Sequence, residues 1–128
     1  MATRHISDDG TVTVETAAAF GILAIVATLA VQVVLLGTSY LLAGQAVREG
    51  AREAALGARA DQVEDLVHAV SGRSDATVTM TPRIRAPGDL VEVRIRMTAP
   101  IVPLIDDLVP DLWVETAALM RVEVNGWN

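Results

Sequence analysis

The sequence contains no cysteine among its 128 residues. This absence excludes disulfides, lipoprotein-type acylation, thiolate metal sites and cysteine nucleophiles. Aromatic residues make up only 3% of the chain, so a hydrophobic core must be built from Val, Leu, Ile, Ala and Met. The formal net charge of −6 argues against a nucleic-acid partner, because nucleic acid would require a basic stripe.

Formal charge is also missing from one long stretch. No residue from Thr16 to Val47 is charged, and Ala, Val, Leu and Ile dominate Ala17–Leu36. About 20 apolar residues, at about 1.5 Å each, cover the roughly 30 Å hydrocarbon core of a bilayer. A soluble helix that is apolar on every face would need a much larger protein around it. We therefore predict a membrane-spanning helix with one small domain attached.

This apolar run differs from a cleaved secretory signal. Such a signal has a basic leading region and an apolar core of roughly 7–15 residues. Here Arg4 is offset by Asp8 and Asp9, and the apolar run is about twice that length. Cleavage near Gly44-Gln45-Ala46 by ordinary signal peptidase is therefore disfavoured.

The residue pattern divides the chain into a polar leader, an apolar transmembrane helix, an amphipathic helical extension and an antiparallel β head: residues 1–10, 11–44, 45–72 and 73–128. We expect one helix from about Thr11 to Ala60. Its amphipathic part carries one apolar stripe at helical spacing, formed by Val47, Ala51, Ala54 and Ala58. Asp61, with Glu64 three residues later, predicts a kink or a new helix, which Gly72 ends.

The rest of the chain reads as three strands. The middle one alternates apolar and charged residues, as is typical of a strand with one buried face: Val91, Val93, Ile95 and Met97. The first is expected to include Val78, Met80 and Ile84, and Pro82 places it at an edge. The turn between these two, Ala86–Asp89, suits type II, and the third strand runs from about Trp113 to Val124. We predict an α+β fold with helix packed on one face of the sheet.

Residues capable of catalysis are scattered. His68 has Glu64 and Asp65 nearby, which makes a metal pair conceivable, but a solvated helix face is the favoured interpretation. Asp106 and Asp107 are adjacent in a Pro-rich link and are expected to cap or solvate a loop. No Ser or Thr has a plausible His partner, and no glycine loop suits a phosphate. We predict no enzyme activity, no cofactor and no metal.

One constellation lies where the leader meets the helix. Gly10 precedes Thr11, and Glu15 follows immediately before the uncharged run. A carboxylate at the mouth of a membrane helix is unfavourable unless it is neutralised. The helix dipole can explain one acidic residue in the first turn, but it does not explain the glycine five residues earlier.

This constellation resembles the N-terminus of type IV prepilins, in which a polar leader ends in Gly and a Glu follows five residues later. The resemblance implies that a membrane aspartyl peptidase cuts after Gly10, so that Thr11 becomes the new N-terminus. It further implies that the Thr11 ammonium pairs with Glu15 of a neighbouring subunit and fixes the subunit register, because an unpaired buried carboxylate is costly.

A second segment narrows the resemblance. Residues 46–55 are similar to the Ala-rich "AREGAR" segment of TadE-like proteins, which are minor pilins or pseudopilins of the tight-adherence (Tad/Flp) pilus. The matching residues are Ala46, Arg48, Glu49, Gly50, Ala51 and Arg52. Two features differ from the family pattern: Thr16 stands where an aromatic or large apolar residue commonly follows the Glu, and the leader is acidic near the cut. The resemblance implies a type IV pilin-like fold and, as partners, a prepilin peptidase, other pilin subunits, the Tad assembly platform and membrane lipid.

The charges that flank the apolar run bear on orientation. Arg48 and Arg52, set against Arg4, slightly favour a cytoplasmic head. The resemblance instead implies a single-pass protein of the cell membrane whose head is extracytoplasmic and which can enter a cell-surface pilus.

Two alternatives stay open. The chain would be either an uncleaved single-pass accessory protein that scaffolds a secretion or assembly complex, or a membrane-tethered domain that binds an anionic partner. The second would use the hairpin arginines, namely Arg83, Arg85, Arg94 and Arg96. Those arginines are otherwise expected to pair with acidic residues on the outer face of the sheet, namely Glu92, Glu115 and Glu123.

Overall fold

The computed structural model describes residues 9–109 and 111–123, with side chains from Val12 onward. It contains two helices and then three strands: α1 (Asp9–Ala55), α2 (Ala60–Ser71), β1 (Thr77–Thr81), β2 (Leu90–Thr98) and β3 (Trp113–Arg121). The predicted α+β layout, a long apolar N-terminal helix followed by a three-stranded antiparallel sheet, is confirmed. Residues 1–8 of the expected leader, and Val124 of the expected third strand, lie outside the described residues.

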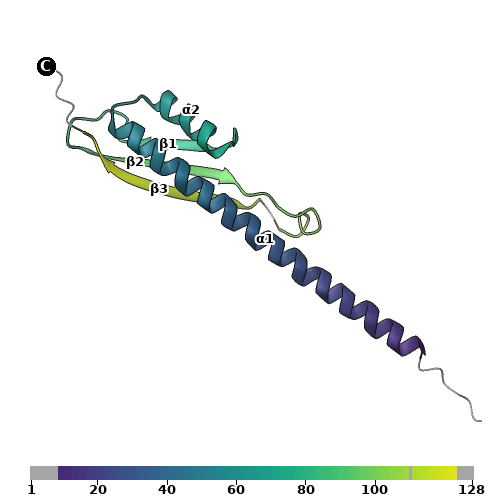
Figure 1. The fold of residues 1–128 in the computed structure, drawn as a ribbon. Coiled ribbons are helices and arrows are strands. Elements are labelled where there is room, and N and C mark those ends of the chain that lie inside the picture. Colours follow the sequence, from purple (N-terminus) through teal and green to yellow (C-terminus); the bar gives the residue numbers. More distant parts are fainter. Residues whose placement is uncertain (1–8, 110, 124–128) are drawn as a thin grey trace, which may run out of the picture.

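The long helix α1 sets the shape of the molecule (Figure 1). Its 47 residues extend over about 70 Å. The C-terminal half lies along the head, whereas the N-terminal half extends beyond it. Within the described chain, α1 is the one helix that is long and apolar enough to cross a membrane.

The sheet has the order β1-β2-β3, and α1 and α2 cover one of its faces (Figure 1). The predicted alternation in β2 is confirmed, because its apolar residues are buried: Val91, Val93, Ile95 and Met97. Opposite Val93 lie Met80 of β1 and Ala118 of β3. The edge position of β1 is also confirmed. The inclusion of Ile84 is wrong: β1 ends at Thr81, and Ile84 is 91% exposed in the connection that follows Pro82.

The predicted type II turn joins β1 to β2. The Asp89 N–H donates to the Ala86 carbonyl at 3.0 Å. Gly88, at the third position, has φ +90°, a conformation that favours glycine. The turn prediction is confirmed.

The prediction of a continuous helix to Ala60 is wrong, because α1 ends at Ala55. Gly57 adopts φ +97° and its N–H donates to the Ala54 carbonyl, while the Ala58 N–H donates to the Glu53 carbonyl. These bonds form a Schellman motif, which satisfies helix-end carbonyls.

The second helix begins one residue before the predicted Asp61. The Gln62 side chain accepts a hydrogen bond from the Arg59 N–H at 2.9 Å. Gln62, rather than Glu64, therefore supplies the side chain of the capping box that bonds the N-cap backbone. Gly72 ends α2 in the left-handed conformation, as predicted. Val63 and Val67 form the buried face, whereas Val70 is 38% exposed.

The two helices approach each other closely at Gly50. A Cβ added there would lie 3.0 Å from Val67 Cγ2 and 3.4 Å from Val63 Cγ1. The neighbouring residues on this face of α1 are also small and fully buried: Ala43, Ala46, Ala51 and Ala54. Small side chains therefore let α2 and the sheet pack closely on α1.

Candidate functional site

Gly10 and Thr11 belong to the first turn of α1. The peptide bond between them is therefore part of a helix in the intact chain. The first four backbone N–H groups of a helix have no intrahelical acceptor, so this turn is held by fewer bonds than the turns that follow. The helix begins at Asp9, two residues before the expected start.

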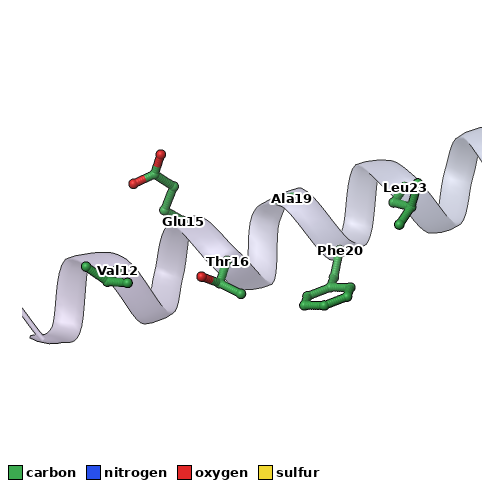
Figure 2. A pocket seen from close by; sticks show the side chains of 6 residues that line it. All are labelled: Val12, Glu15, Thr16, Ala19, Phe20 and Leu23. Atoms are coloured by element: carbon green, nitrogen blue, oxygen red, sulfur yellow. The ribbon is translucent and has the colours of Figure 1, made fainter.

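Glu15 lies in the second turn of α1, on an otherwise apolar surface (Figure 2). It is exposed and borders a shallow groove whose lining is mostly apolar: Val12, Glu15, Thr16, Ala19, Phe20 and Leu23. Figure 2 shows the carboxylate projecting from one side of the helix and the Phe20 ring from the opposite side. No ion pair to Glu15 forms within residues 9–109 and 111–123. Any ion-pair partner of this carboxylate therefore lies outside this part of the chain.

Three hydroxyl groups within the apolar run are satisfied inside the helix. Thr28 donates to the Ala24 carbonyl at 2.8 Å, and Ser39 donates to the Leu35 carbonyl at 2.9 Å. Thr38 bonds the Val34 carbonyl in the same way. Such bonds let a helix carry hydroxyls in hydrocarbon without unpaired polar atoms.

Gln32 is the polar residue of the apolar run that contacts the head. It is only 6% exposed. Its Nε2 donates to the Pro100 carbonyl at 3.1 Å, and its Oε1 accepts from the Val102 N–H at 2.9 Å. Sequence reasoning missed this clamp, although a lone Gln among aliphatic residues was a signal that something polar faces it.

Residues 46–55 of α1 have a buried face and an exposed face. Ala46, Gly50 and Ala51 are buried against the head. The charged members face solvent, and Arg52 contacts Glu49 at 3.7 Å with both side chains more than half exposed. Because exposed ion pairs contribute little to stability, the packing role belongs to the small residues.

The predicted pairing on the outer face of the sheet is confirmed for Arg94. Its guanidinium lies 2.7 Å from Glu92 on its own strand and 2.7 Å from Glu115 on β3. These two carboxylates raise the pKa of Arg94, Glu115 contributing most. Arg96 instead stacks over the Trp113 ring, 3.8 Å from its centroid.

The prediction that Arg85 faces the outer surface is wrong. Its guanidinium donates to the carbonyls of Ala54 and Ala58, at the C-terminal end of α1. This contact places a cation where the helix dipole favours positive charge. The hairpin arginines therefore do not form one anion-binding cluster.

A second charged pair lies where the sheet meets the loop between β2 and β3. Arg73 contacts Asp75 at 2.8 Å, and the Thr98 N–H donates to the same carboxylate at 3.1 Å. These hydrogen bonds hold the pKa of Asp75 well below its usual range, and the bond from Arg73 makes the largest contribution. Asp75, Arg96 and Trp113 also line a shallow depression at this end of the sheet.

His68, which was considered for metal binding, contacts the backbone instead. His68 Nε2 lies 2.8 Å from the Ala76 carbonyl, so the ring ties α2 to the segment before β1. Glu64, Asp65, Asp106 and Asp107 are exposed. The described residues contain no group of three or more His, Cys, Asp or Glu side chains that is arranged to hold a metal ion.

Comparison of the chain with known protein families, with curated proteins and with solved structures gave no match. The features that bear on function are therefore those of the chain itself. They are an exposed apolar half-helix with one carboxylate near its start, and a small head packed on the other half.

Proposed function

We propose that the chain is a TadE-like minor pilin or pseudopilin, cleaved after Gly10 by a prepilin peptidase, that acts structurally in the assembly of a Tad/Flp-type pilus. One observation carries this proposal: Glu15 stands on the exposed apolar half of α1, five residues after Gly10, without an ion-pair partner among the described residues.

The exposed half of α1 supports a role in association. Large apolar side chains cover it all round and are 52–67% exposed, among them Phe20, Ile22, Leu23, Ile25, Val26, Leu29 and Val31. Full burial of such a side chain stabilises a protein by about 1.5–3 kcal/mol, and removing the part that is still exposed here contributes a share of that. Lipid provides this environment before assembly, and neighbouring pilin helices provide it within a fibre.

Processing after Gly10 would give Glu15 a partner. Cleavage leaves Thr11 with a free ammonium group, and four residues separate it from Glu15, a rise of about 6 Å along the helix. A neighbouring helix shifted along its axis by this distance brings its own ammonium level with Glu15. An unpaired carboxylate among packed apolar helices costs several kcal/mol, so this pairing selects one axial register.

The proposal places the head outside the cytoplasm. The weak opposing signal comes from Arg48 and Arg52, which lie on the head side of the span. Arg48 is about 25 Å beyond Val31, the last residue before the clamped part of α1. That distance is near the limit within which flanking charges orient a span.

Mass spectrometry of the membrane fraction tests the cleavage. With a cognate prepilin peptidase co-expressed, we expect a mature chain that begins at Thr11. Cells that make fibres while the chain still carries Met1 to Gly10 would contradict the proposal.

Substitution of Glu15 tests the assembly role. We expect Glu15→Ala to abolish incorporation into fibres while the head stays folded, because the substitution removes the register-setting charge. The matched control is Glu49→Ala, since Glu49 is exposed on the head side of the same helix. If the Glu15→Ala chain were incorporated into fibres as well as the wild type, Glu15 would have no role in assembly.

An uncleaved accessory membrane protein is the second candidate. One observation favours it: α1 begins at Asp9, so the Gly10–Thr11 bond is helical in the intact chain, whereas peptidases act on extended backbone. A scaffold of this kind would keep its leader, and Glu15→Ala would leave its function nearly unchanged.

A further inference from the structure

The loop between β2 and β3 reaches down α1 as far as Gln32. Both polar atoms of the Gln32 side chain bond the backbone of this loop, at Pro100 and Val102. Below this clamp, the described side chains of α1 from Val12 to Val31 are exposed, except for that of Thr28, which is half-buried. These 20 residues measure about 30 Å, which matches the hydrocarbon thickness of a bilayer. When this segment spans a membrane, the loop lies at the membrane surface.

The tip of this loop presents two leucines. Ile105, Leu108 and Val109 donate backbone hydrogen bonds to carbonyls three or four residues earlier, which forms a single helical turn. Leu104 is 67% exposed and Leu108 is 80% exposed. The loop tip therefore presents two exposed apolar side chains that are four residues apart in the sequence.

The base of the loop carries residues suited to lipid headgroups. Trp113 begins β3 directly after the loop and pairs with Thr98, the last residue of β2. Its ring is half-exposed, and the Arg96 guanidinium stacks 3.8 Å from the ring centroid. Tryptophan is enriched at membrane interfaces, and guanidinium groups bind phosphate.

We propose that this loop is a phospholipid-contacting surface. Leu104 and Leu108 enter the interface between headgroups and acyl chains, while Trp113 and Arg96 lie at the level of the headgroups. Exposed Asp106 and Asp107 stay in water, so the contact is driven by apolar burial rather than by attraction to anionic lipid. The surface would hold the head at a fixed height above the bilayer. This proposal rests on the proposed function only in that α1 spans a membrane, and it does not require cleavage after Gly10.

The cysteine-free sequence allows single nitroxide labels to be placed without further changes. The test uses the full chain, reconstituted in phosphatidylcholine vesicles, with a label at Leu104→Cys or Leu108→Cys. The matched control is Leu119→Cys, because Leu119 is 66% exposed but lies toward the far end of β3. A fourth label, at Val26→Cys, reports whether α1 is in the membrane. Electron paramagnetic resonance then compares collisions with oxygen, which concentrates in lipid, and with a water-soluble nickel chelate present on both sides.

We expect labels at 104 and 108 to collide more often with oxygen than with the chelate, as the label at 26 does, and the label at 119 to show the reverse. A lipid-exposed label at 26 with water-exposed labels at 104 and 108 overturns the loop proposal and leaves the membrane span intact. Labels at 104 and 108 that are shielded from both reagents and show spin–spin broadening indicate a second copy on this surface, which also overturns it. A water-exposed label at 26 instead contradicts the membrane span itself.

Discussion

The two halves of α1 share one backbone but differ in the size of their apolar residues. From Val12 to Val31 large apolar residues outnumber the alanines and glycine, and the side chains are exposed except for that of Thr28, which is half-buried. From Ala43 to Ala55 the buried positions hold mainly Ala and Gly. Small residues allow another backbone to approach closely, whereas large residues provide apolar area for lipid or for other helices. Residue size, rather than hydrophobicity alone, therefore indicates which half of this helix packs within its own chain.

The largest expected effect comes from adding volume at the close approach in the packed half. Gly50→Val should destabilise the head by about 3 kcal/mol, because its Cβ would already lie 3.0 Å from Val67 Cγ2. Gly37→Val is the matched control, since nothing lies within 4 Å of a Cβ added there, and its effect should stay within about 0.5 kcal/mol. Urea unfolding in detergent micelles, followed by tryptophan fluorescence, measures both. Equal losses would show that the halves do not differ in packing.

Local patterns in the sequence were sufficient for much of this architecture. The alternation in β2 and the turn at Gly88 depend on residues that are close in the chain, and both were predicted correctly. The break after Ala55 was missed, although Gly57 was a local signal for it.

The remaining features depend on backbone partners that sequence periodicity does not reveal. Gln32 bonds residues about 70 positions away, and Arg85 bonds carbonyls 27 and 31 positions earlier. The partner atoms of both side chains belong to the main chain, so no side-chain pattern identifies them. At the candidate site, sequence placed Glu15 on the apolar helix, but the described part of the chain contains no ion pair to it that would reveal its role.

The hydrogen bonds of Gln32 to the loop lie at the boundary between the two halves, and a substitution can remove them. Gln32→Leu leaves the Val102 N–H and the Pro100 carbonyl without their partner and should cost about 2 kcal/mol. Hydrogen exchange at the Val102 amide should accelerate with it. Gln45→Leu, at an exposed position of the same helix, is the control and should leave this exchange unchanged. Unaltered exchange at Val102 in Gln32→Leu would show that the clamp does not hold the loop.

Matched valines sharpen the comparison further. Val47 is 2% exposed and Val26 is 56% exposed. Val47→Ala should cost about 1.5 kcal/mol of head stability, since it removes two buried carbon groups, whereas Val26→Ala should leave head stability nearly unchanged. The same micelle unfolding assay measures both variants. A loss of head stability from Val26→Ala would mean that the exposed half also supports the head.

The smallest expected effect is electrostatic and belongs to the head alone. The folded pKa of Asp75 lies below its usual range, so its stabilisation is complete at neutral pH and is lost as the pH falls through and below that range. Because 40% of the side chain is exposed, solvent screening limits the effect to less than about 1 kcal/mol. Between pH 7 and pH 3, Asp75→Asn should lose less stability than the wild type.

The control for this pH dependence is Asp107→Asn, since Asp107 is exposed in the loop. Its urea midpoint should fall with pH by the same amount as that of the wild type. Identical pH profiles for Asp75→Asn and the wild type would remove Asp75 as a source of acid sensitivity.

The closing contacts at the end of α1 have a consequence for the order of synthesis. The Ala58 carbonyl accepts a hydrogen bond from Arg85, and the Ala55 carbonyl accepts one from the Glu123 N–H at 3.0 Å. A ribosome makes α1 long before it makes either donor. These two carbonyls therefore lack these donors while the strands are translated, and the head closes only after nearly all of these 128 residues have emerged.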